Sequence, residues 1–146
     1  METTSHSSAA RPDACWTTVA RQYLPHERMP LTTPVTFSYR RRDPLCIRAV
    51  FHCAGDNDVV WDLGRDMLAG ATRTLTGGSD VLAWPEASGD RLWLRLGPAD
   101  ADQALLSLDR ILLTAWIETT YLLVPPGTEE AHLDWTPLHR LLTPHD

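Results

Sequence analysis

The sequence predicts an α+β domain built on an antiparallel sheet, and two features of the chain lead to this prediction. Short runs of alternating apolar and polar residues recur through most of the chain and are separated by brief turns. A long apolar stretch then follows, with polar side chains at the three- and four-residue intervals of a helix. Strands grouped ahead of a long helix, instead of alternating with helices, are typical of α+β proteins.

The alternating runs predict the strands of this sheet. They cover residues 15–24, 35–40, 45–53, 81–84 and 91–96. The last run has the clearest alternation, because its three leucines share one face and Arg91, Trp93 and Arg95 share the other. A short turn joins the second run to the third, which predicts an antiparallel hairpin. A short helix is expected over residues 64–72.

The longest predicted helix begins near Asp100 or Asp102 and ends before the proline pair at 125–126. Polar residues recur along it at Ser107, Arg110, Thr114 and Glu118. Its apolar arc is wider than one buried face requires, so we expect a second cover, either another element or another copy of the chain. The residues expected at such a self-association surface are Leu105, Leu108, Ile111, Leu112, Trp116 and Ile117. A last short helix is expected after Thr136-Pro137.

Length and composition predict one domain in a reducing compartment. Residues 1–14 form a polar lead with no apolar period, and residues 15–146 hold the domain. Three cysteines, Cys15, Cys46 and Cys53, cannot all pair and form no CxxC motif, which favours a cytoplasmic protein. No signal peptide is evident, and the long apolar stretch carries too many charges for membrane insertion.

The sequence contains no recognisable catalytic or cofactor-binding motif. GxSxG, HExxH and a phosphate-binding glycine loop ending in lysine are all missing from it. His52 and Cys53 are strand neighbours and so point to opposite faces. The spacing of His132, Asp134 and His139 matches no common zinc pattern. We therefore expect no enzyme activity, no metal and no cofactor.

One basic and aromatic surface offers an alternative function. Arg91, Trp93 and Arg95 share a strand face, and Arg48 lies on a possible neighbouring strand. Stacking of a base on Trp93 between arginines suits single-stranded nucleic acid. The net charge of −6 and the pI of about 5.4 argue against this function, because a phosphate backbone requires a basic face.

A second alternative is a pocket for a small ligand. A curved sheet covered by a long helix can enclose such a pocket, as helix-grip proteins do. It would lie beneath residues 105–116 and would require an apolar cavity there.

Several ordered segments of the chain match a known family. They are Asp43-Pro44 with Ile47–His52, Val60-Trp61, Arg65–Leu68, Thr76–Val81, Trp84-Pro85, Val124–Glu129 and Leu133-Asp134. Together they span about residues 43–142, and in this order the chain resembles the SsgA-like proteins, sporulation and cell-division regulators of Streptomyces and related actinomycetes. Each segment is weak alone, whereas their order and intervals together are specific.

The resemblance implies an antiparallel-sheet fold like that of the Whirly nucleic-acid-binding proteins, assembled as a homotrimer. It also implies a non-enzymatic role in sporulation-specific septation. Such a protein would localise or activate the tubulin-like division protein FtsZ, or act with cell-wall synthesis enzymes, and would be recruited to septa from the cytoplasm.

Overall fold

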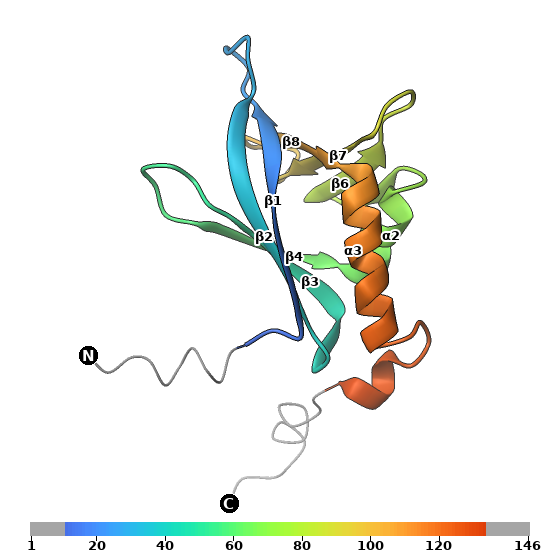
Figure 1. Ribbon diagram of the computed structural model, residues 1–146. Coiled ribbons are helices and arrows are strands. Elements are labelled where there is room, and N and C mark those ends of the chain that lie inside the picture. The colour runs from blue at the N-terminus through green and yellow to red at the C-terminus, as the bar shows by residue number, and fades with distance from the viewer. Residues whose placement is uncertain (1–10, 134–146) are drawn as a thin grey trace, which may run out of the picture.

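Eight strands pair antiparallel in one curled sheet in the computed structural model, which describes residues 11–133 (Figure 1). The strands are β1 (Ala14–Tyr23), β2 (Leu31–Arg40), β3 (Asp43–Phe51), β4 (Val59–Gly64), β5 (Thr76–Gly77), β6 (Val81–Pro85), β7 (Arg91–Leu96) and β8 (Ala104–Asp109). The helices are α2 (Arg65–Ala71), α3 (Arg110–Leu123) and the 3-10 turn η1 (Glu129–His132). The strand order is β4-β3-β2-β1-β8-β7-β6-β5, and both α-helices cover the same face, so the predicted α+β class is confirmed.

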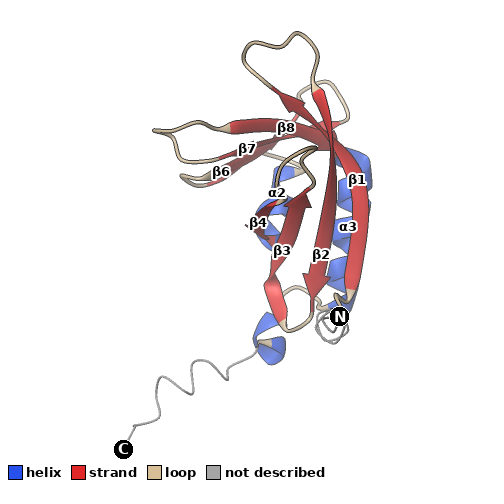
Figure 2. Ribbon diagram, turned by 90° about the vertical axis from the view of Figure 1, so that its left-hand side faces the viewer, coloured by secondary structure: helices blue, strands red, loops and turns tan. Residues whose placement is uncertain are grey.

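The sheet bends where β1 meets β8. β1 pairs with β2 over residues 14–22, whereas its pairing with β8 covers only Arg21–Tyr23. Beyond this short contact the two groups of strands diverge, and β1 runs alongside α3 (Figure 2). Within the described residues, the stretch 14–20 of β1 therefore has a strand partner on one side only. Backbone groups on its other side are free to pair with another chain.

Most of the predicted elements are confirmed, and the side chains alternate as expected. On β3, Ile47, Ala49 and Phe51 are buried under the helices. On β7 the three leucines are buried and Arg91, Trp93 and Arg95 point to the outer face. The helix expected over residues 64–72 is present as α2, which covers Arg65–Ala71.

The predicted start of the long helix is wrong. Residues 104–109 form β8, which pairs with β7 along its whole length, and α3 begins only at Arg110. Leu106 and Leu108 face the core from this strand, whereas Ser107 lies between them on the opposite face. Ser107 therefore fits a strand alternation as well as a helical stripe. Pairing with β7 decides between the two, because tertiary contacts override weak local preference.

The core lies between the sheet and α3 and is built around three aromatic rings. The Trp16 ring stacks on Phe37 with centroids 5.7 Å apart and on Trp116 with centroids 6.2 Å apart. Phe37 and Trp116 are themselves 5.9 Å apart. These rings fill space beneath α3 where the ligand-pocket hypothesis requires a cavity, so the structure gives that hypothesis no support.

Two predictions fall wholly or partly outside residues 11–133. They are the polar lead over residues 1–14, of which only the last four are described, and the short helix after Thr136-Pro137. Inside the described range, no helix is both long and apolar enough to span a membrane.

Candidate functional site

Helix α3 presents three different faces, and these define the candidate sites. One face enters the core through Leu113, Trp116 and Thr120. A second face is turned toward α2, and the third is exposed to solvent. Asp109 caps the helix, since its carboxylate accepts a hydrogen bond of 2.9 Å from the Leu112 amide. This cap fixes the register in which the three faces are displayed.

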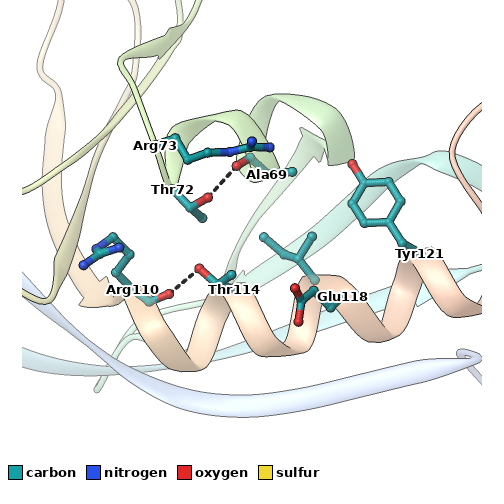
Figure 3. Close-up of a pocket in the computed structure, with 8 residues that line it drawn as sticks. Ala69, Thr72, Arg73, Arg110, Thr114, Glu118 and Tyr121 are labelled. Atoms are coloured by element: carbon teal, nitrogen blue, oxygen red, sulfur yellow. Dashed lines mark hydrogen bonds between the residues drawn. The ribbon is translucent and has the colours of Figure 1, made fainter.

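A groove with a volume of about 440 Å³ lies between α2 and α3 (Figure 3). It is lined by Ala69, Thr72, Arg73, Arg110, Thr114, Ile117, Glu118 and Tyr121. The wall formed by α3 contains Arg110, Thr114 and Glu118, which are the later members of the polar series seen in the sequence. The four-residue spacing places these side chains on one helix face.

The solvent face of α3 is an apolar stripe. Its members, which we call the α3 stripe, are Ile111, Leu112, Ala115, Thr119 and Leu122. Leu122 is 82% exposed, and Ile111 and Leu112 are more than half exposed. Large apolar side chains gathered on one helix face in this way are typical of an interaction surface.

The structure divides the six residues predicted for self-association between interior and surface. Leu108, Trp116 and Ile117 are buried inside the chain, so they are not exposed at a surface where a second copy could contact them. Leu105 lies half-buried on the outer face of β8. Ile111 and Leu112 belong to the exposed α3 stripe.

The outer face of β1, β8, β7 and β6 forms a second candidate surface, with aromatic and basic side chains. The rings of Tyr23 and Trp93 lie 5.0 Å apart, and Trp84 is paired opposite Trp93 on the neighbouring strand. Arg91 donates hydrogen bonds to the carbonyl and hydroxyl oxygens of Ser107. Burial lowers the pKa of Arg91 from its usual value, and so does the nearby positive charge of Arg21.

Arg48 does not belong to this outer surface, so its expected position beside β7 is wrong. Three strands, β2, β1 and β8, separate β3 from β7. Arg48 instead forms an ion pair with Asp62 of β4, in which Nε lies 2.8 Å from Oδ1. This hydrogen bond holds the pKa of Asp62 below its usual range. The strand order was needed to see this, since the sequence shows only that both strands carry outward arginines.

A buried arginine joins α2, α3 and the loop that follows α3. Arg65 is 1% exposed, and its Nη1 donates to the carbonyl oxygens of Thr120 and Val124 at 3.0 and 2.9 Å. Its Nη2 donates to Glu129 at 2.8 Å. Arg65 thereby satisfies the Val124 carbonyl just beyond α3 and adds a second donor to the Thr120 carbonyl, which also accepts from the Val124 amide.

Two tyrosine rings enclose the same guanidinium group. The Tyr121 ring centroid lies 4.1 Å and the Tyr39 ring centroid 5.2 Å from the Arg65 carbon Cζ. Burial raises the pKa of Tyr39 to about 12, so this phenol is neutral at physiological pH. These contacts fix α2 against α3 and hence fix the shape of the groove.

The histidines and cysteines form no metal centre within residues 11–133, where no group of three potential ligands occurs. His52 is hydrogen-bonded to Thr36 at 2.8 Å and faces Asp58 at 3.3 Å. Cys15, Cys46 and Cys53 are free thiols. Burial raises the pKa of Cys46 to about 11, which keeps it protonated. The other two candidate ligands, Asp134 and His139, lie outside the described residues.

Sequence reasoning missed two parts of these sites. Thr72 and Arg73 follow a short helix with no motif, and only the packing of α2 on α3 brings them beside Arg110. Alternation predicts that Arg21 and Tyr23 lie on a strand, but nothing in the sequence shows that this strand pairs with β8. Each case depends on a contact between distant segments.

Comparison with known proteins identifies relatives of this fold. The family model for "Streptomyces sporulation and cell division protein, SsgA" matches residues 33–129. The sporulation-specific cell division protein SsgB of Streptomyces coelicolor is 32% identical over 105 residues, which cover 71% of this chain and 77% of that protein. SsgB of Salinispora tropica is 30% identical over 140 residues, covering 92% of this chain and 97% of that protein.

Solved structures give the same result. A structure of SsgB, from work on longitudinal cell division during sporulation of Streptomyces coelicolor, superposes with a TM-score of 0.73 at 28% identity, covering 82% of this chain and 94% of that chain. The crystal structure of an SsgA-like sporulation-specific cell division protein from Thermobifida fusca gives a TM-score of 0.76 at 26% identity, covering 89% of this chain and 95% of that chain. The chain therefore belongs to the SsgA family of sporulation and cell division proteins.

Proposed function

We propose that this chain is a non-enzymatic regulator of sporulation-specific cell division that acts by binding other proteins. Its partners on this proposal are FtsZ or the cell-wall synthesis machinery, and its place of action is the cytoplasm, from which it is recruited to septa. The relatives are named sporulation-specific cell division proteins, which supports the process. The α3 stripe supports the mode of action, because it offers an apolar surface and no reactive groups.

Self-association is part of this proposal, and the α3 stripe is the observation that carries it. Three large apolar side chains, Ile111, Leu112 and Leu122, are exposed on one face. The singly paired stretch of β1 runs beside the same helix (Figure 2). A second copy can cover the stripe and pair with the β1 edge, and a homotrimer is the assembly we propose.

The test is the solution mass, measured by light scattering over a range of protein concentrations. We expect a concentration-independent trimer for the unmodified chain and a monomer for the double variant Ile111→Glu, Leu122→Glu. Val60→Glu serves as the matched control, because Val60 is 52% exposed but lies on β4. A stable monomer that also captures no division or wall-synthesis protein would contradict the proposal.

Partner binding is tested separately with purified FtsZ from the same host. We expect the chain to sediment with FtsZ polymers, and a fluorescent fusion to gather at sporulation septa. Sedimentation that is equal with and without polymer would contradict an FtsZ partner and would direct the search to wall-synthesis enzymes.

A second candidate function is binding of single-stranded nucleic acid on the outer face, as in Whirly proteins. The adjacent rings of Tyr23 and Trp93 favour it, because bases stack on aromatic side chains. Arg21 and Arg95 flank the pair. A salt-dependent change in tryptophan fluorescence on adding an oligonucleotide supports this function, and no change at low salt excludes it.

A further inference from the structure

The groove between α2 and α3 is lined by charged and polar side chains that self-association through the α3 stripe does not use. Arg73 is exposed, and its guanidinium group makes no hydrogen bond or ion pair with any residue in 11–133. Arg110 makes only one long ion pair, in which Nη2 lies 3.7 Å from Asp90, and Asp90 is itself 73% exposed. Two guanidinium groups on facing walls therefore make no short ion pair within residues 11–133, and the groove they line holds one carboxylate, that of Glu118. This is unusual in a chain whose net charge is −6.

The position of Arg110 makes an additional anion favourable. It is the first residue of α3, where the helix dipole is positive and disfavours a cation. Its Nε is buried without an acceptor among the described residues. A carboxylate at this end of the groove would offset both the dipole and the arginine charge.

The other polar groups of the groove are arranged to accept hydrogen bonds, because the threonine hydroxyl protons are already used in local bonds. The Thr72 hydroxyl donates its proton to the carbonyl oxygen of Ala69 at 2.6 Å, and the Thr114 hydroxyl donates to that of Arg110 at 2.7 Å (Figure 3). The lone pairs of both hydroxyl oxygens remain for an N–H donor. Glu118, which is exposed, adds an acceptor on the same helix.

The floor of the groove is apolar. Ile117 is 3% exposed, and Ala69 of α2 lines the same groove. An occupant must therefore supply carboxylates for the arginines, N–H groups for the threonines and an apolar side chain for the floor. An extended acidic peptide combines all three. Inorganic phosphate does not fit as well, because it brings acceptors and almost no donors.

We propose that the α2–α3 groove binds an extended acidic segment of the partner protein. Arg73 and Arg110 hold its carboxylates, and the threonine oxygens receive its backbone N–H groups. This inference rests on the proposed function, since it assigns to the division-machinery partner the segment that docks here.

The experiment uses the full chain and two capped hexapeptides as probes. One alternates aspartate with valine, and the other has asparagine at each aspartate position. In ¹⁵N-labelled protein we expect the acidic peptide to shift the backbone amides of Thr72 and Thr114 and the side-chain Nε–H signals of Arg73 and Arg110. The asparagine peptide should bind about ten-fold or more weakly, because it lacks the charge-assisted bonds.

Variants then test the anchors. Arg73→Glu and Arg110→Gln should each weaken the acidic peptide by about ten-fold, with an unchanged thermal midpoint showing that the chain is folded. Arg95→Glu is the control matched to Arg73→Glu, because it makes the same charge change on the outer face of β7. Equal affinity for the two peptides, absence of shifts at the groove, or an equal loss in Arg95→Glu would overturn the proposal.

Failure of this inference can be distinguished from failure of the proposed function. If Arg73→Glu still sediments with FtsZ polymers as the unmodified chain does, the groove is not the docking site, although the regulatory function stands. If the unmodified chain binds no division protein, the proposed function fails. The peptide titration still decides whether the groove recognises acidic segments.

Discussion

Two arginine sites in contact with the same two helices differ in how far their charges are satisfied. Arg65 is buried, makes two hydrogen bonds to carbonyl oxygens and one to Glu129, and lies between two tyrosine rings. Arg73 and Arg110 line an open groove and together make one ion pair, at 3.7 Å. Arg65 therefore contributes to the fold, whereas the groove arginines contribute little to it. The comparison indicates that an arginine whose guanidinium makes no short hydrogen bond at a concave surface is available to a ligand.

The largest expected effect on stability comes from replacing Arg65, the arginine whose hydrogen bonds are satisfied. Arg65→Met removes the donor to the Val124 carbonyl and one of the two donors to the Thr120 carbonyl, which keeps the Val124 amide. It also removes the ion-pair partner of Glu129, which is 13% exposed. Removing one member of a buried ion pair costs about 3–5 kcal/mol, and we expect the free energy of unfolding to fall by about that amount. Urea unfolding followed by circular dichroism measures it. A loss below about 1 kcal/mol would show that the site does not hold the helices together.

The pH dependence of stability tests the same Arg65 site, with a smaller expected effect. The Glu129 backbone amide lowers the pKa of its carboxyl from the usual 4.5, and Arg65 and the Gly127 amide act in the same direction. A lowered folded pKa means that the stabilisation is complete above pH 4.5 and is lost as the pH falls through the folded value.

Glu129→Gln should therefore be less stable than the unmodified chain at neutral pH and should converge with it in acid. Thermal midpoints measured between about pH 7 and pH 3 test this. Glu130→Gln is the control, because Glu130 is exposed and adjacent in η1. Parallel curves for the unmodified chain and Glu129→Gln would contradict the assigned ion pair.

The N-cap of α3 gives an intermediate effect, because it orients the helix but lies at the surface. Asp109→Ala removes the hydrogen bond to the Leu112 amide, and we expect a loss of about 1 kcal/mol in unfolding free energy. Asp109→Asn keeps an acceptor at the same place and should cost much less. Equal losses for the two variants would indicate that charge, not capping, is what matters at this position.

Local patterns predicted much of this fold, and long-range contacts account for what they missed. Alternation gave the faces of β3 and β7 correctly, because one side of the sheet is covered by helices and the other is not. The sequence predicts a helix over residues 104–109 because Ser107 fits a helical stripe, and only pairing with β7 makes this segment a strand. The error placed Leu105 and Leu108 on the wrong element.

The candidate sites show the same limit. Arg110, Thr114 and Glu118 were recognised as one polar series, since four-residue spacing is visible in any sequence. The opposite wall of the groove is not predicted, because no sequence pattern relates Thr72 and Arg73 to a helix nearly forty positions later. Arg48 was grouped with β7 for a related reason, since strand order is a property of the sheet and not of any strand.

The smallest expected effect on stability comes from replacing the two arginines of the groove. Arg73→Met and Arg110→Met should each change the unfolding free energy by less than about 0.5 kcal/mol, because neither arginine has a short hydrogen bond to lose. Denaturant titration of these variants beside Arg65→Met puts all three arginines on one scale. The same two variants should lose affinity for the acidic hexapeptide, so stability and binding separate at the groove. A loss above about 2 kcal/mol in either variant would mean that its charge serves the fold after all, and that the contrast with Arg65 does not hold.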